Sequence, residues 1–337
     1  MRISPRALSP RWWTTLSPES SLSFLNRAAG TEGSGRLLFG AADFEMMGHS
    51  IIFAAQRSMN MKRLTIFFAL LFVSTALFAQ GKVTTRKHLF SDFSDKITKV
   101  VMSGNEILDG ALRQEVVDLW TLSPFEFCSM AEYESLKKSD TYYFLLVTAG
   151  QAKGEEEPMV RFLTLEKGGA EKGDNIALRT EVISLPLCPV DGGSGREFVF
   201  LPALVKGVQE FTAEAMESEK VAYSGMTWFN GHFDKKGAIK RIYLAKEDIS
   251  ESVSTKEREK YMDEDIILCD EDEADKAYTD KTYNTLVSYT VSAGTWSYKM
   301  LVEADTDTVY YLRKHKVNAK NAPGFLAEDL KRISRKR

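Results

Sequence analysis

A basic start followed by an apolar run, at residues 61–79, most constrains what this chain can be. Lys62 and Arg63 precede residues 64–78, which are apolar except for three hydroxyl side chains. Ala79 then supplies a small residue directly before Gln80. This architecture is typical of a secretory signal peptide. We therefore expect residues 80–337 to be exported, to the periplasm or out of the cell.

Residues 1–60 precede that segment, although a signal peptide acts at the N-terminus of a chain. They contain six Arg and no Lys, whereas the residues from 61 onward contain 12 Arg and 26 Lys. This shift favours Met61 as the true start. An Arg- and Ser-rich transit peptide is the alternative, but it does not explain a complete signal peptide behind it. We expect no ordered fold in residues 1–60.

The exported part, residues 80–337, is acidic and long enough for one large core or two small ones. It contains 36 Lys and Arg against 43 Asp and Glu, which gives a net charge of −7 with His neutral. This excess argues against nucleic acid or an anionic membrane as partner. No apolar run after Ala79 approaches the roughly 20 residues that span a bilayer. We expect no transmembrane segment there, and an unknown envelope protein or a small ligand as partner.

Three cysteines remain after the signal peptide: Cys128, Cys188 and Cys269. An oxidising compartment would permit one disulfide with one thiol left over, and the sequence does not choose among the three pairings. The alternative is that all three are small buried side chains.

Hydrophobic periodicity predicts the same order of elements twice. After Asn105, a predicted N-cap, Leu108, Leu112 and Val116 recur at helical spacing. Ser129, with Glu132 three residues later, predicts a capping box at the start of a second helix. In the first half we expect strands at 97–102, 125–128, 141–148, 159–165 and 176–185, and a third helix from about 202. In the second half we expect strands at 240–244, 266–269, 283–291, 295–302 and 308–317, and helices at 254–262, 271–279 and 323–333.

An ungapped offset of 141 residues superposes the two halves. It places Cys128 on Cys269 and Tyr142 on Tyr283. Because the element order also matches, we predict an internal duplication. The expected fold is α/β, with α+β-like mixed sheets, in two tandem βαβαβββα domains at 80–218 and 240–337. An aromatic connector, residues 219–239, joins them.

The first unit resembles small α/β domains of Gram-negative envelope proteins. Such domains occur at the N-terminus of the propeller protein of the Tol system and in the curli secretion lipoprotein. The resemblance lies in residues 111–119 as the first helix, 125–127 as the second strand and 140–146 leading into the third strand. It implies a role in assembly and docking, with no catalytic motif.

Motifs for catalysis or metal binding are missing from this sequence. His88, His232 and His315 stand far apart, with no metal-ligand spacing. The glycine-rich loop at 192–195 matches neither a nucleophile elbow nor a phosphate-binding loop. The acidic run at 263–275 fails the calcium-loop pattern, and it is typical of a solvated helix start. We therefore assign no catalytic residue, no metal site and no cofactor.

The connector holds the candidate ligand-binding residues Trp228, Phe229, Asn230 and His232. Junctions between domains are favoured ligand sites, and large aromatic side chains are typical contact residues. The alternative is that Trp228 and Phe229 fasten the two domains together.

Two functions remain after these exclusions. The first is a non-enzymatic exported protein that binds, docks or scaffolds in the cell envelope of a Gram-negative bacterium. The second is a periplasmic or secreted hydrolase with a site at the inter-domain junction, whose catalytic groups lie far apart in the sequence.

Overall fold

The computed structural model describes residues 86–169, 181–233 and 241–334. The expectations for residues 1–60 and for the signal peptide at 61–79 lie outside the described residues. So do those for 80–85, 234–239 and 335–337, and for the starts of the strands expected at 176–185 and 240–244.

The first sheet has the order β2-β1-β3-β4-β5. Strand β1 pairs in parallel with β2 and β3, whereas β3, β4 and β5 form an antiparallel meander. Parallel neighbours require crossover connections, and helices supply them here. The strands are β1 (Ile97–Met102), β2 (Phe125–Ser129), β3 (Tyr142–Gly150), β4 (Val160–Lys167) and β5 (Glu181–Pro189).

The second sheet has the same topology, β7-β6-β8-β9-β10. Here β6 pairs in parallel with β7 and β8, and β8, β9 and β10 form the meander. The strands are β6 (Arg241–Ala245), β7 (Ile266–Cys269), β8 (Thr285–Ala293), β9 (Trp296–Glu303) and β10 (Val309–Lys316). The predicted fold class, two duplicated mixed α/β sheets, is confirmed.

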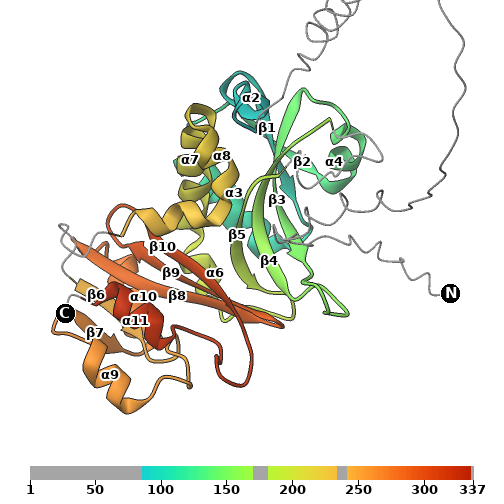
Figure 1. Cartoon of the computed structure of the whole chain (residues 1–337). Coiled ribbons are helices and arrows are strands. Elements are labelled where there is room, and N and C mark those ends of the chain that lie inside the picture. Colours follow the sequence, from blue (N-terminus) through green and yellow to red (C-terminus); the bar gives the residue numbers. More distant parts are fainter. Residues whose placement is uncertain (1–85, 170–180, 234–240, 335–337) are drawn as a thin grey trace, which may run out of the picture. The chain divides into compact units, whose positions relative to one another are not determined.

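Helices cover both faces of each sheet. In the first unit α4 lies on one side of the sheet and α3 and α7 lie on the other (Figure 1). In the second unit α9 and α11 contact each other and one hydrophobic cluster, and α10 packs on β6 and β8. The helices are α2 (Arg86–Phe90), η1 (Phe93–Asp95), α3 (Glu106–Leu119), α4 (Met130–Leu136), α6 (Arg196–Val199), α7 (Leu201–Glu217), α8 (Glu219–Ser224), η2 (Gly225–Gly231), α9 (Thr255–Tyr261), α10 (Glu271–Thr279) and α11 (Ala327–Ile333).

Local capping explains where the crossover helices begin. The Asn105 side chain accepts a hydrogen bond from the Leu108 amide, as the sequence predicts. Ser129 and Glu132 form the predicted capping box. Such caps satisfy amides that have no partner within the helix. Leu108 is also one of the buried apolar residues of α3, so the cap and the core face share one turn.

Equivalent strands of the two units are not related by one constant offset along the chain. Val101 pairs with Cys128 and Ala245 pairs with Cys269, so the offset of 141 holds at β2 and β7. It becomes 143 at β3 and β8, because α10 has nine residues and α4 has seven. Tyr142 is therefore equivalent to Thr285 and not to Tyr283 as predicted, and the two units share their topology with little identity between equivalent strands.

The last helix begins at Ala327 and not near Pro323 as predicted. Gly324 has φ +101°, which right-handed helix does not permit. The Phe325 amide donates to the Asp248 carbonyl at 2.7 Å, and Phe325 pairs with Ile249 in an isolated bridge. These backbone contacts to the loop after β6 delay the start of α11.

One hydrophobic core runs through both units. The same cluster contains Val208 and Phe211 of α7 together with Tyr289 of β8 and Met300 of β9. The predicted connector belongs to this core, because its described residues form α8 and η2 and Phe229 is fully buried. Element η2 contacts both β5 and β10. Within the described residues, none of the helices is long and apolar enough to cross a membrane.

We predict that Phe229→Ala lowers the free energy of unfolding by about 3–5 kcal/mol, as removal of a buried aromatic ring does. Trp228→Ala should cost less, because Trp228 is only partly buried. The control Tyr223→Ala removes a ring that is 64% exposed, and it should change stability by less than about 0.5 kcal/mol. Thermal unfolding checks all three, and an unchanged Trp228→Ala melt would favour the ligand-binding alternative.

Candidate functional site

A glycine-rich loop, residues 192–195, leads into α6. The anion that lies against this loop is the carboxylate of Glu197. The Gly195 amide donates to the Glu197 carboxylate at 2.8 Å. A Cβ atom at Gly193 would collide with the same carboxylate. Gly195 itself has φ 95°, where side chains other than hydrogen are strained. The loop therefore positions the start of α6 and not an external phosphate.

Arg196, the first residue of α6, reaches into the second unit. Its Nη1 lies 3.2 Å from both Asp248 Oδ1 and Glu271 Oε1, and its Nη2 lies 2.8 Å from Asp275 Oδ1. Nη2 also donates to the Ser288 carbonyl at 2.9 Å. The side chain is 6% exposed. One guanidinium thus links α6 to the loop after β6, to α10 and to β8.

Three carboxylates face this single cation. Burial opposes the charge on Arg196, but attraction to Asp248 and Asp275 raises the pKa of the guanidinium above its ordinary value. Burial raises the pKa of Asp275 and of Glu271, outweighing the attraction of Arg196. The Asp248 carboxylate also accepts hydrogen bonds from the hydroxyls of Ser288, at 2.6 Å, and of Thr290, at 2.5 Å. The cluster is an ionic join between the units.

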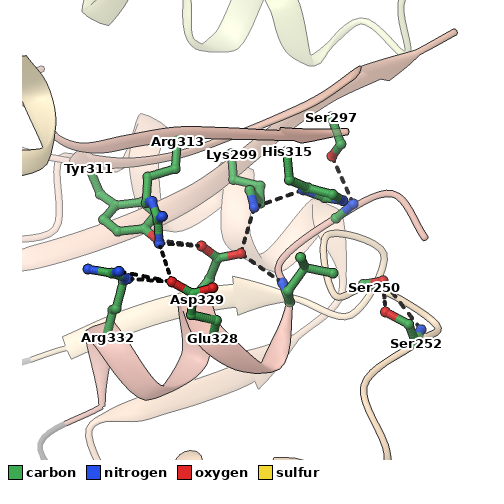
Figure 2. Close-up of polar contacts among 12 residues, drawn as sticks. Ser250, Ser252, Ser297, Lys299, Tyr311, Arg313, His315, Glu328, Asp329 and Arg332 are labelled. Carbon is green, nitrogen blue, oxygen red and sulfur yellow. Dashed lines mark hydrogen bonds and ion pairs between the residues drawn. The ribbon is translucent and has the colours of Figure 1, made fainter. Parts of the chain in front are cut away.

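A second buried network lies between β9, β10 and α11 (Figure 2). Lys299 Nζ lies 2.6 Å from Asp329 Oδ2, and both side chains are at most 3% exposed. The Tyr311 hydroxyl donates to Asp329 Oδ1 at 2.5 Å, and the Leu326 amide donates to Oδ2 at 2.9 Å. These bonds to the charged form lower the pKa of Asp329 although burial opposes them. The network fastens α11 to the sheet.

His315 extends this network as a neutral ring. Its Nδ1 lies 2.9 Å from Lys299 Nζ, and its Nε2 lies 3.1 Å from the Ala322 carbonyl. Burial, together with the charge of Lys299, lowers the pKa of His315. Nδ1 therefore accepts from Lys299 and Nε2–H donates to Ala322. Both ring nitrogens are used, so the histidine serves the fold and is not poised as a general base.

The first sheet carries a polar track on the face that α4 covers. Glu166 and Glu181 are paired across β4 and β5, beside a bulge. Burial raises the pKa of each carboxyl. The Tyr133 hydroxyl donates to Glu166 at 2.7 Å, and Glu181 is hydrogen-bonded to Ser184. Like charges directly opposite in a sheet destabilise it, and the charge of Glu166 adds to the effect of burial on the pKa of Glu181.

Hydroxyl groups extend this polar track from Ser184 on β5 across β4 to Thr148 on β3. Ser184 Oγ lies 2.9 Å from Thr164 Oγ1, which lies 2.7 Å from Thr148 Oγ1. Thr164 and Ser184 are both buried. Two carboxyls with raised pKa values beside linked hydroxyls make this the arrangement that most resembles an acid/base site among the described residues.

The sequence-predicted ligand residues are brought together in η2 and just after it. Phe229 is buried, Trp228 and His232 are partly buried, and Asn230 is exposed. The His232 ring lies edge-on to Trp228, with centroids 4.1 Å apart. Phe211 of α7 contacts Trp228 in a T-shaped pair, with ring centroids 5.7 Å apart. These residues pack together as an aromatic cluster, and ligand binding by them stays a prediction.

Cys128, Cys188 and Cys269 are all buried, and none of them is in a disulfide. Burial raises the pKa of all three thiols, of Cys188 and Cys269 to about 11. They are therefore unreactive at neutral pH. Among the described residues no group of three or more His, Cys, Asp or Glu side chains could hold a metal ion.

Sequence reasoning did not find Arg196, Lys299 or the Glu166–Glu181 pair. The partners of Arg196 lie 52 to 92 residues away, which no motif spacing reveals. A weak signal did exist, because Thr164 and Glu166 stand on either side of Leu165 in the buried part of β4. Lys299 likewise interrupts a buried strand. Comparison with known proteins finds no family model, no curated protein and no solved structure that matches this chain.

We predict that Lys299→Leu lowers the free energy of unfolding by about 3–5 kcal/mol, because it removes the buried cation of Asp329 and leaves only the partly exposed Arg313, at 3.6 Å. The double variant Lys299→Leu with Asp329→Leu should recover part of that loss. Chemical unfolding measures both, and Lys316→Leu on the same sheet is the control. A single variant as stable as the wild type would contradict an ion pair that fastens α11.

We predict that Glu181→Gln stabilises the protein at pH 7 and that the gain disappears as the pH falls toward about 4, the ordinary pKa of a glutamate. The folded state raises the pKa of Glu181, so it binds more protons than the unfolded state. This group therefore costs stability above its folded pKa and costs none below the ordinary value.

The matched control is Glu156→Gln, because Glu156 is exposed in the β3–β4 loop. Unfolding curves from pH 4 to pH 8 should show no crossing between this variant and the wild type. A Glu181→Gln protein that is less stable than the wild type at pH 7 would contradict the repulsion between Glu166 and Glu181.

Proposed function

We propose that this chain is an exported, non-enzymatic protein of the cell envelope, which binds or scaffolds a partner through a rigid pair of α/β domains. The observation that carries the proposal is the use of its buried chemical groups. Arg196 and Lys299 each bind carboxylates that hold elements together. His315 is bonded through both ring nitrogens. Side chains committed in this way maintain a shape rather than contact a substrate.

The fixed relation between the units supports the same proposal. Sheet two is joined to α6 by the Arg196 cluster and to α7 by one continuous core. A scaffold needs its binding surfaces at constant separation, and a shared core with a buried ion cluster provides this. The basic start and apolar run at residues 61–79 support export. The acidic exported part supports a protein partner over nucleic acid.

One observation favours the hydrolase alternative. Glu166 and Glu181 are opposed across neighbouring strands, and both have raised pKa values. Two carboxylates in environments that change their protonation are the basis of many acid/base mechanisms. Glu181 also interacts electrostatically with Lys314 of β10, which places it near the second unit.

A fractionation and cross-linking experiment in the native host separates these functions. The protein should be recovered in the osmotic-shock fraction with an N-terminus at or near Gln80. Chemical cross-linking in intact cells should give the same adduct for the wild type, Glu181→Gln and the control Glu156→Gln. Recovery in the cytosol with residues before Met61 retained would contradict export. Hydrolysis of an ester, glycoside or peptide substrate that only Glu181→Gln abolishes would favour the enzyme.

A further inference from the structure

Strand β7 presents one open edge to its surroundings. It pairs with β6 on one side, where the Ile242 amide donates to Asp265 and the Lys246 amide donates to Cys269, both at 2.9 Å. Among the described residues no strand pairs with its other side. In a parallel pair alternate residues face the neighbour, so the backbone groups of Leu268 point away from β6. They are available to a further strand.

The equivalent edge of the first unit, β2, is protected in two ways that β7 lacks. With Cys128 equivalent to Cys269, β2 has the charged Glu126, which is ion-paired with Lys99 of β1, in the position of Ile267. It also has Phe127 in the position of Leu268, and the Arg113 guanidinium of α3 covers that ring at 4.2 Å. Charges and covers of this kind prevent edge-to-edge pairing.

The second unit has only a short crossover helix beside its edge. Helix α9 has seven residues and α3 has 14. Leu268 is consequently 39% exposed, one of the exposed large apolar side chains of the molecule. Strand β7 itself contains Ile266, Ile267, Leu268 and Cys269, with no charge. The edge formed by β7 is therefore uncharged and exposed, whereas the equivalent edge, β2, carries a charge and a covered aromatic ring.

The charges around this edge indicate what kind of strand would bind to it. Exposed acidic residues flank β7, with Glu264 before it and Asp270, Asp272 and Glu273 after it. A second copy of β7, in either direction, would bring acidic flanks against acidic flanks, which is unfavourable. A strand with apolar residues at its centre and basic residues at both ends would complement the edge in shape and in charge.

We propose that β7 binds an extended peptide segment of a partner protein by strand addition, and that this segment is apolar with basic flanks. Backbone hydrogen bonds to the outer side of β7 supply affinity, Leu268 supplies the apolar contact, and the flanking carboxylates fix the position of the ends. The proposal rests on the proposed binding function and names the class of partner and the surface it uses.

The test uses a labelled peptide, Lys-Lys-Val-Ile-Val-Ile-Lys-Lys, against the purified protein, with fluorescence anisotropy and amide hydrogen exchange. We expect binding, and slower exchange of the Leu268 amide when the peptide is present. Leu268→Lys should weaken binding by about tenfold or more, since it exchanges an apolar contact for charge repulsion. Val117→Lys, at an exposed apolar residue of α3, is the matched control and should bind like the wild type.

Further measurements separate the outcomes. A peptide with Glu in place of each Lys should not bind, and higher salt should weaken the Lys peptide. Equal binding by the wild type and a folded Leu268→Lys, or by both peptides, would overturn the proposal, as would no binding of the Lys peptide. Dimerisation that Leu268→Lys abolishes would also overturn it, in favour of a second copy. If cross-linking in cells still gives an adduct with Leu268→Lys, the binding function stands and only the β7 assignment fails.

Discussion

The fixed arrangement of the two units depends on the burial of one guanidinium. Removing a charge from water costs several kcal/mol per ion unless opposite charges and hydrogen bonds replace the solvent. Arg196 meets this condition only in the joined molecule, because all its carboxylate partners belong to the second unit. Its guanidinium also lies over the rings of Phe200 and Tyr289. Separation of the units would also leave three carboxylates near one another without their cation. The contact therefore satisfies the buried cation of the first unit and the carboxylates of the second.

The two units share a topology but not a chemistry. Strand pairing makes Leu163 equivalent to Lys299 and Thr164 equivalent to Met300. Leu163 lies in the apolar core of the first unit, on the face that α7 covers. Its equivalent in the second unit, Lys299, forms a buried ion pair with Asp329 of α11. The reverse holds on the opposite face, where an apolar residue of the second unit replaces a hydroxyl. A sheet topology can tolerate such exchange because backbone pairing, and not any one side chain, defines it.

Much of this fold could be predicted from the sequence, because its determinants are local. Periodicity gave the order of elements, and the Ser129–Glu132 pair gave the start of α4 to the residue. The repeated order of elements was also visible, although equivalent strands such as β3 and β8 share no identical residue. The long-range polar contacts could not be found in this way. The partners of Arg196 come from the loop after β6, from α10 and from β8, and only the folded sheet brings them together. Glu166 and Glu181 meet because a bulge near Val182 sets their register, which sequence pattern does not specify.

The join between the units also explains why the copies diverged. Sheet two buries Tyr289 and Met300, on its α10 face, in the core that it shares with α7. The equivalent face of sheet one contains Thr164, which is bonded to Thr148 and Ser184. A face that is buried in a shared core gains from being apolar, whereas the face with Thr164 satisfies its hydroxyl groups internally and meets the second unit through Phe162, whose ring lies edge-on to Tyr298 at 5.5 Å. The two faces are therefore not interchangeable, because hydroxyl groups in place of Tyr289 and Met300 would bring polar atoms into the shared core.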